Sequence, residues 1–145
     1  MTKAAYHHGN LHEALLEAAR ALLAESGVEG LSLRKVAKAA GVSATAPYSH
    51  FRDKQALLAE LAAEGFDELA DSMESQAASA GDDTRQRLAG LARGYVAFAT
   101  QNPALFQLMF GPAVSGLLDF PALVASPQVK GRAKGNKSGR IVPDW

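Results

Sequence analysis

The feature that most constrains this chain is a very short break between two helical segments, at residues 41–43. Before the break, apolar residues recur at helical spacing over 33–40, and Ser32 is placed to cap that helix. After the break, Ser43 is placed to cap a second helix that reaches about Phe51. Two short helices joined by so tight a turn predict a helix-turn-helix.

The turn makes specific demands on its residues. Gly41 has to take a positive φ, which glycine does at little steric cost. Val42 is expected to fill the angle between the helices, and Ser43 to cap the second one. Ala37 is small at the point where we expect the two helices to approach most closely. The residue types at these positions all favour the same motif over 32–51.

The remaining periodic segments also predict helices, and the sequence contains no β pattern of any length and no internal repeat. The first helix is expected over Leu11–Ser26, with Asn10 and Glu13 forming a capping box and Gly27 ending it. Further helices are expected from the cap Asp53 to about Ala77, from Asp82 or Asp83 to Asn102, and over Ala104–Phe110, with weak helix or loop over 113–125. The chain is therefore predicted to be all-α.

Composition excludes several classes of protein. Because the chain has no cysteine, disulfides and thiolate metal sites are excluded. No run of about 18 apolar residues indicates a membrane span, and the N-terminus lacks the apolar stretch of a signal peptide, so we expect a cytoplasmic protein. The formal charge of zero is a sum over three segments: residues 1–54 have a net positive charge, residues 55–118 a net negative charge, and residues 119–145 a net positive charge. This segregation permits phosphate contact without requiring it.

The second helix of the motif has an unusual composition for a buried element. Its residues are mostly small or polar, and short side chains let a backbone approach the bases in a DNA major groove about 12 Å wide, while the helix N-terminus suits a phosphate. We expect Thr45, Ala46 and Ser49 to read base edges, and the charged and aromatic residues to reach phosphates. The full predicted DNA-binding set is Arg34, Lys35, Ala44, Thr45, Ala46, Tyr48, Ser49, His50 and Lys54. Spacing alone leaves open a helical protein that touches no DNA.

A longer signature follows the turn. Residues Tyr48-Ser49-His50-Phe51-Arg52-Asp53-Lys54, followed by Ala56-Leu57-Leu58, resemble the Tyr-x-His-Phe-x-x-Lys-x-x-Leu-Leu pattern of TetR/AcrR-type transcriptional regulators. Residues 32–43 are similar to the upstream part of the same motif, so the resemblance covers about 10–70. The stretches 6–11 and 102–110 are also similar to one subgroup of that family.

The resemblance implies a three-helix DNA-binding head and a helical body that binds a small apolar ligand. It also implies a homodimer that binds a palindromic operator in double-stranded DNA. Binding of the ligand is then expected to release the protein from the DNA. Tyr48, His50 and Lys54 stand where the family contacts phosphates, and Thr45, Ala46 and Ser49 stand on its base-reading face. The implied domains are a head over 9–69, with the helix-turn-helix at 32–51, and a partial ligand-binding and dimerisation body over 70–125. The glycine-rich, basic composition of 126–145, which resembles nothing in the family, predicts a disordered tail.

Three departures from the family pattern stand out. Pro47 lies one turn inside the second helix of the motif and is expected to tighten it, and Lys35 replaces a common acidic residue. The body is shorter than in such proteins, so we expect the two late helices through which they dimerise to be missing, as after a truncation or frameshift. Dimerisation is therefore in doubt, and we expect an apolar patch to stay uncovered at Leu105, Phe106, Leu108, Met109 and Phe110.

The sequence gives less support to other interpretations. The sequence does not support an enzymatic function, because it contains no nucleophile elbow, phosphate-binding loop or paired carboxylates. No cofactor is expected. His8 and His12 are four residues apart, but a helix starting at Leu11 leaves His8 outside it, so no metal site is expected. A helical protein-interaction module stays open as an alternative. A ligand pocket is hypothesised at Tyr95, Phe98, Phe106, Met109 and Phe110, with plain core as the competing interpretation.

Overall fold

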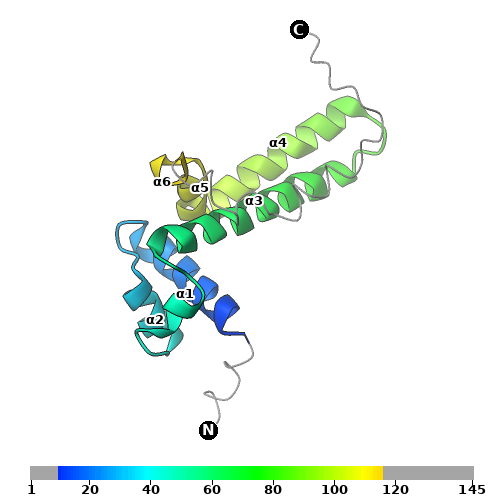
Figure 1. Cartoon of the computed structure of the whole chain (residues 1–145). Helices are drawn as coiled ribbons and strands as arrows, with labels where there is room; N and C mark the ends of the chain where they lie inside the picture. The colour runs from blue at the N-terminus through cyan, green and yellow to red at the C-terminus, as the bar shows by residue number, and fades with distance from the viewer. Residues whose placement is uncertain (1–9, 116–145) are drawn as a thin grey trace, which may run out of the picture.

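The fold is all-helical, as predicted, in the residues 10–115 that the computed structural model describes (Figure 1). No strand occurs among those residues. The elements are α1 (Leu11–Ser26), α2 (Leu33–Ala40), the 3₁₀ helix η1 (Ala46–Ser49), α3 (Lys54–Ala78), α4 (Thr84–Gln101), α5 (Pro103–Phe110) and α6 (Pro112–Ser115). Three predictions concern residues outside this described range: the family resemblance at 6–9, the weak helix or loop over 116–125, and the disordered tail at 126–145.

The first helices pack around one apolar core with the start of α3. Apolar residues at helical spacing turn one face of α1 and one face of α2 inward, and Phe51 closes the core from the segment before α3. The largest fully buried side chains of this core are Leu15, Leu23, Leu31, Val36, Phe51, Leu57, Leu58 and Leu61. This packing fixes how the surface formed by α2 and η1 is presented.

Three of the predicted N-terminal helix caps are confirmed, and Asn10, at the start of α1, is not one. The side chains of Ser32, Asp53 and Asp83 each accept a hydrogen bond from the backbone N–H three residues on, at 3.2, 2.9 and 3.1 Å. Asp83, rather than Asp82, therefore caps α4. Asn10 makes no such bond to the backbone; its side-chain amide donates to the Glu13 carboxylate instead, so the expected capping box is not formed.

The long helices α3 and α4 form an antiparallel hairpin that extends away from the head (Figure 1). Two buried glycines, Gly90 and Gly94, lie where α4 meets the backbone of α3. The Ser72 hydroxyl donates to the Gly94 carbonyl at 2.9 Å across the same contact. A hairpin packed this closely tolerates no side chain at these two positions.

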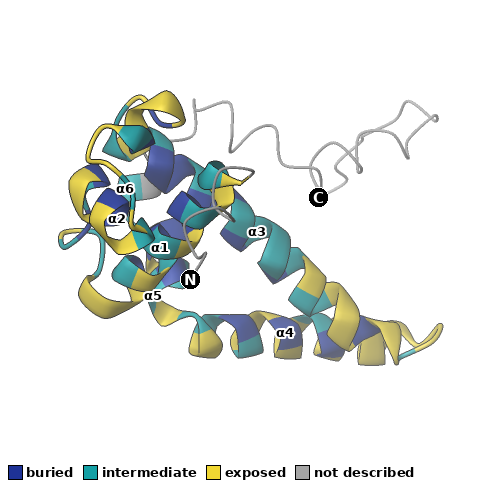
Figure 2. Cartoon of the chain, turned by 90° about the horizontal axis from the view of Figure 1, so that it is seen from below, coloured by how far each residue is buried: buried dark blue, intermediate teal, exposed yellow. Residues whose placement is uncertain are grey.

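The last helices fold back toward the head, and α5 packs against α1 and α3. Leu105, Leu108 and Met109 are buried there, so the expectation that they stay uncovered is wrong. The physical reason is that Gly65 lets α5 come close to α3, with Met109 over the missing side chain. Of the five expected patch residues, Phe110 alone is strongly exposed, and Phe106 is half-buried. Exposed residues lie along α4 and the tip of the hairpin, and also on α2 and the turn that follows it in the head (Figure 2).

No helix in the described part of the chain combines the length and apolarity needed to cross a membrane. Within residues 10–115, no three histidine, cysteine or acidic side chains gather as they would around a metal ion.

Candidate nucleic-acid interface

The turn between α2 and η1 has the geometry that its sequence predicts. Gly41 lies in the left-handed region, at φ 70° and ψ 31°, where a Cβ would be strained. Its backbone N–H bonds the carbonyls of Ala37 and Lys38, and the Val42 N–H donates to the Ala37 carbonyl at 3.0 Å. Val42 is half-buried against the core. The chain therefore leaves α2 abruptly and projects the next residues outward.

The prediction of an α-helix from Ser43 to about Phe51 is wrong in both the type and the length of the helix. Only Ala46–Ser49 is helical, as a 3₁₀ turn, and Ser43 caps nothing; its hydroxyl lies 3.3 Å from that of Thr45. The reason is Pro47, which has no N–H to donate and whose ring would clash with the carbonyl four residues back. Tight bonds over three residues, such as Tyr48 N–H to the Thr45 carbonyl at 3.1 Å, replace the α pattern. A 3₁₀ turn this short offers no helix N-terminus for a phosphate.

The predicted contact residues of this turn are on the surface. Tyr48 is 60% exposed, and Ala44, Thr45, Ser49 and His50 are exposed as well. Ala46 is half-buried. Pro47 is fully buried and anchors the turn to the core. The Ser49 hydroxyl donates to the Ala46 carbonyl at 2.7 Å, and its oxygen keeps lone pairs that can accept a hydrogen bond.

A histidine for which the sequence predicts no role at the site holds the end of this turn. His12, on α1, pairs with Glu60 of α3 at 2.7 Å between Nε2 and Oε2. Its ring stacks on Phe51 at 5.1 Å and meets His50 edge-on at 5.3 Å, measured between ring centroids. His50 is therefore positioned by a contact from another helix. The sequence contains no local signal for this cluster, because its members are up to 48 residues apart.

The predicted cations behave differently from one another. Arg34 and Lys35 are exposed on α2. The Lys35 ammonium donates to the Gly30 carbonyl at 2.9 Å, and the Lys54 ammonium donates to the Val28 carbonyl at 2.7 Å. Both lysines thus hold the loop between α1 and α2, although an ammonium with three donors keeps others for a phosphate.

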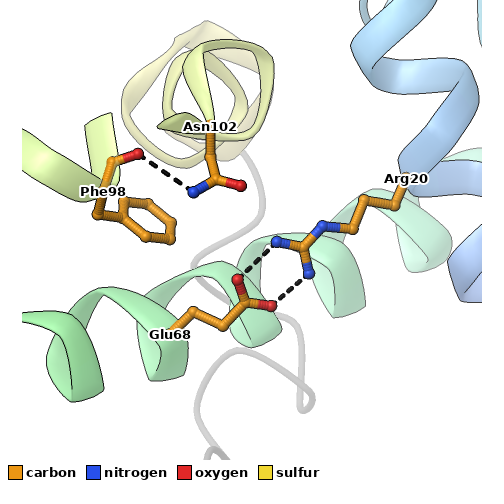
Figure 3. A network of polar contacts seen from close by, with 4 residues as sticks. All are labelled: Arg20, Glu68, Phe98 and Asn102. Carbon is orange, nitrogen blue, oxygen red and sulfur yellow. Dashed lines mark hydrogen bonds and ion pairs between the residues drawn. The ribbon is translucent and has the colours of Figure 1, made fainter. Parts of the chain in front are cut away.

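An ion pair links α1 to α3 behind this surface. The Arg20 guanidinium donates through both terminal nitrogens to the two oxygens of Glu68 (Figure 3). This hydrogen bonding raises the pKa of Arg20, and burial raises the pKa of the nearby Glu64 carboxyl. In the same view, the Asn102 amide donates to the Phe98 carbonyl at 3.2 Å and caps the end of α4.

The hypothesised ligand-pocket residues are only partly brought together. The Tyr95, Phe106 and Phe110 rings gather, with the Phe106 and Phe110 centroids 4.7 Å apart. Phe98 and Met109 are buried in the core. A hollow of about 830 Å³ opens between α3 and α4 and is lined by none of these five residues.

Comparisons with known proteins agree with this geometry. The family profile described as "Bacterial regulatory proteins, tetR family" matches residues 15–61. The uncharacterized HTH-type transcriptional regulator YobS of Bacillus subtilis is 31% identical over 99 residues, which are 68% of this chain and 51% of YobS. A solved structure of a protein of unknown function from Rhodococcus sp. RHA1 has a TM-score of 0.71 and 38% identity, over 90% of this chain and 67% of that chain.

The TetR-family regulator PfmR of Thermus thermophilus has the same fold, with a TM-score of 0.60 at 24% identity over 81% of this chain and 63% of that chain. The chain is thus an all-helical protein with an N-terminal helix-turn-helix head. Its head, at residues 15–61, matches the tetR family of bacterial regulatory proteins, and the curated relatives support a TetR-type regulator. It spans about half the length of curated relatives such as YobS.

Proposed function

We propose that this chain is a transcriptional regulator whose head, over residues 9–69, binds double-stranded DNA. The observation that carries the proposal is the exposed turn 44–50, which a left-handed Gly41 and a buried Pro47 project beyond the core. Its small side chains let the backbone come close to base edges in a major groove. The head matches a family of regulatory proteins, which supports the same conclusion.

The proposed roles follow from exposure and chemistry. Thr45, Ala46 and Ser49 read base edges, and Tyr48 and His50 reach phosphate oxygens. Arg34, Lys35 and Lys54 add charge at the neighbouring backbone, and Ala44 leaves room for its approach.

Residues 70–125 are proposed as a partial regulatory body, although α3 runs without a break across the expected boundary at 69/70. We propose further that the protein is a cytoplasmic, ligand-responsive repressor that acts as a homodimer on a palindromic operator. The aromatic cluster of Tyr95, Phe106 and Phe110 is the proposed place for an apolar ligand.

A second candidate function is a helical protein-interaction module, or a regulator with impaired dimerisation. The observation that favours it is the exposure of large apolar side chains on α4 and α5: Leu88 is 67% exposed, Val96 58% and Phe110 53%. An exposed apolar patch marks an interaction surface, and Phe110 lies beside the ring of Tyr95 on α4. Sedimentation of the full chain separates the two, because a repressor of this kind sediments as a dimer.

The DNA-binding proposal is tested by a gel shift on the promoter next to the coding gene. The unmodified chain is expected to shift this duplex, and the double variant Tyr48→Ala, Lys54→Ala is expected to bind it more weakly and with a flatter salt dependence. A matched control is Arg93→Ala on α4, which removes one exposed charge far from the turn. Equal binding by the double variant contradicts the proposed contact residues, and no shift by the unmodified chain contradicts the proposed function.

A further inference from the structure

Helix α4 carries an apolar stripe along one of its sides. Leu88, Leu91 and Tyr95 follow one another at intervals of three and four residues, so they share one side of the helix, and Val96 widens the stripe. Leu88 is 67% exposed, Val96 58% and Tyr95 38%, while Leu91 is half-buried. We call these four residues the α4 stripe.

The α4 stripe is continuous with the hollow of about 830 Å³ between α3 and α4. Leu91 belongs both to the stripe and to the wall of the hollow, and Phe66 forms part of the wall on α3. The Phe110 ring joins the two, because its centroid lies 5.4 Å from that of Phe66 and 6.5 Å from that of Tyr95. Stripe and hollow thus form a single apolar surface, which we call the hairpin face, and a contiguous patch of this kind marks an interaction surface.

The two helices beside this surface carry opposite charge. Helix α4 contains three arginines and no acidic residue, whereas every charged residue of α3 after Lys54 is acidic. Exposed Glu74 and Arg87 line the hollow from α3 and α4 respectively. None of the three arginines forms an ion pair within residues 10–115. The hairpin face therefore has an acidic border on α3 and a basic border on α4.

A second copy of this chain complements such a face. When two hairpins meet face to face around a two-fold axis that runs along the hairpin, α4 of each copy lies over α3 of the other. The basic helix then meets the acidic helix on both sides of the axis, whereas an axis across the hairpin brings together helices of like charge. The charges therefore favour the first arrangement. It also keeps both heads at the same end of the dimer, as two half-sites on one duplex require.

We propose that the hairpin face is the contact surface of a homodimer, in which the α4 stripe of each copy packs over the hollow and the acidic border of the other. This contact rests on the homodimer of the proposed function and gives that homodimer its surface. It lies on α3 and α4, and not on late helices such as those through which the resembling family dimerises. Because one head can meet DNA without it, the contact can fail while the DNA-binding proposal stands.

The first test is sedimentation velocity of the full chain over a range of protein concentrations. The unmodified chain is expected to sediment as a dimer that dissociates on dilution. Leu88→Glu places a carboxylate in the α4 stripe, opposite the acidic border of the other copy, and is expected to raise the dissociation constant of the dimer by about tenfold or more. Gln86→Glu is the matched control, because it adds the same charge at an exposed position of α4 away from the stripe, and it should leave the dimer intact.

Crosslinking shows which helices meet, because the chain has no cysteine of its own. Leu88→Cys on α4 and Ala78→Cys on α3 each introduce one exposed thiol at the same level of the hairpin, since Gly90 meets the backbone of Ala77. A mixture of the two variants is expected to crosslink faster with a short bifunctional maleimide than either variant alone. Faster crosslinking of either variant to itself would show that like helices meet, which overturns the proposed arrangement.

The remaining outcomes separate this contact from the function on which it rests. A dimer that neither Leu88→Glu nor Val96→Glu weakens has its contact elsewhere, which overturns the inference and leaves the proposed homodimer standing. A chain that stays monomeric at every concentration overturns both, and the hairpin face is then covered from within the chain or by another molecule. The gel shift described above still tests DNA binding in that case. Circular dichroism checks that the variants are folded, as expected for substitutions at exposed positions.

Discussion

Replacing Gly94 by alanine should push helices α3 and α4 apart and lower the stability of the hairpin that they form. A Cβ built at Gly94 would lie 2.5 Å from the Met73 Cα and 2.7 Å from the Met73 backbone nitrogen, against about 3.5 Å or more for a normal contact. Since the atoms it meets belong to the backbone of α3, no side-chain rotation relieves the overlap, and α4 has to move by roughly 1 Å. The 2.9 Å hydrogen bond from Ser72 to the Gly94 carbonyl is stretched by the same movement.

The expected cost follows from these terms. Overpacking costs about 1–3 kcal/mol, and a backbone clash belongs at the upper end. A weakened hydrogen bond adds about 1 kcal/mol, while alanine gains about 1 kcal/mol over glycine in helix propensity. We therefore expect Gly94→Ala to lower the free energy of unfolding by about 2–3 kcal/mol.

The assay is urea unfolding followed by circular dichroism, with Ala92→Leu as a control on the exposed face of the same helix. The control adds a larger side chain and should change stability by less than about 0.5 kcal/mol. A Gly94→Ala variant more stable than the unmodified chain would refute the close packing, because helix propensity alone predicts that result.

Three further predictions concern the head and its link to α3. Gly41→Val, which places a β-branched residue at φ 70°, should cost about 1–2 kcal/mol in urea unfolding, and a neutral result would contradict the left-handed turn. A double-mutant cycle on Arg20 and Glu68 should give a coupling of about 0.5–1 kcal/mol, because the pair is bidentate but half-exposed, and a value of zero would contradict the pairing. Glu64→Gln should stabilise the protein at pH 7 by less than about 1 kcal/mol after allowance for solvent screening, since burial raises the pKa of Glu64 and its ionised form is disfavoured in the fold. The stability that protonated Glu64 contributes is present at acid pH and lost as pH rises through its folded pKa, so the gain from glutamine should vanish below about pH 4, and a gain that persists there would contradict this cause.

Elements set by local chemistry were predictable from the sequence. The bounds of α1 and α2 coincide with those expected, and the caps Ser32 and Asp53 act as predicted, because periodicity and capping depend on residues within one turn of each other. Pro47 indicated a tight turn, but the pattern around it did not show that the α-helix would be lost entirely. The 3₁₀ turn is stabilised in part by burial of Pro47 in the core, which is a tertiary effect.

The site was predictable in its exposed residues and not in their supports. Tyr48 and His50 are on the surface as expected. The pairing of His12 with Glu60, and of the Lys54 ammonium with the Val28 carbonyl, joins residues far apart in sequence. Helical spacing identifies which face of a helix is buried, but it does not specify which side chain lies opposite on another helix. The contacts that orient the site therefore required the folded structure.

The central claim is that the turn 44–50 reads duplex DNA. The most direct measurement is selection of bound duplexes from a pool of randomised sequence, followed by sequencing, with the unmodified chain and a Thr45→Ala, Ser49→Ala variant side by side. We expect the unmodified chain to enrich a defined motif and the variant to lose or alter that motif while still retaining DNA. Enrichment of no motif by the unmodified chain, or of the identical motif by the variant, would contradict the claim.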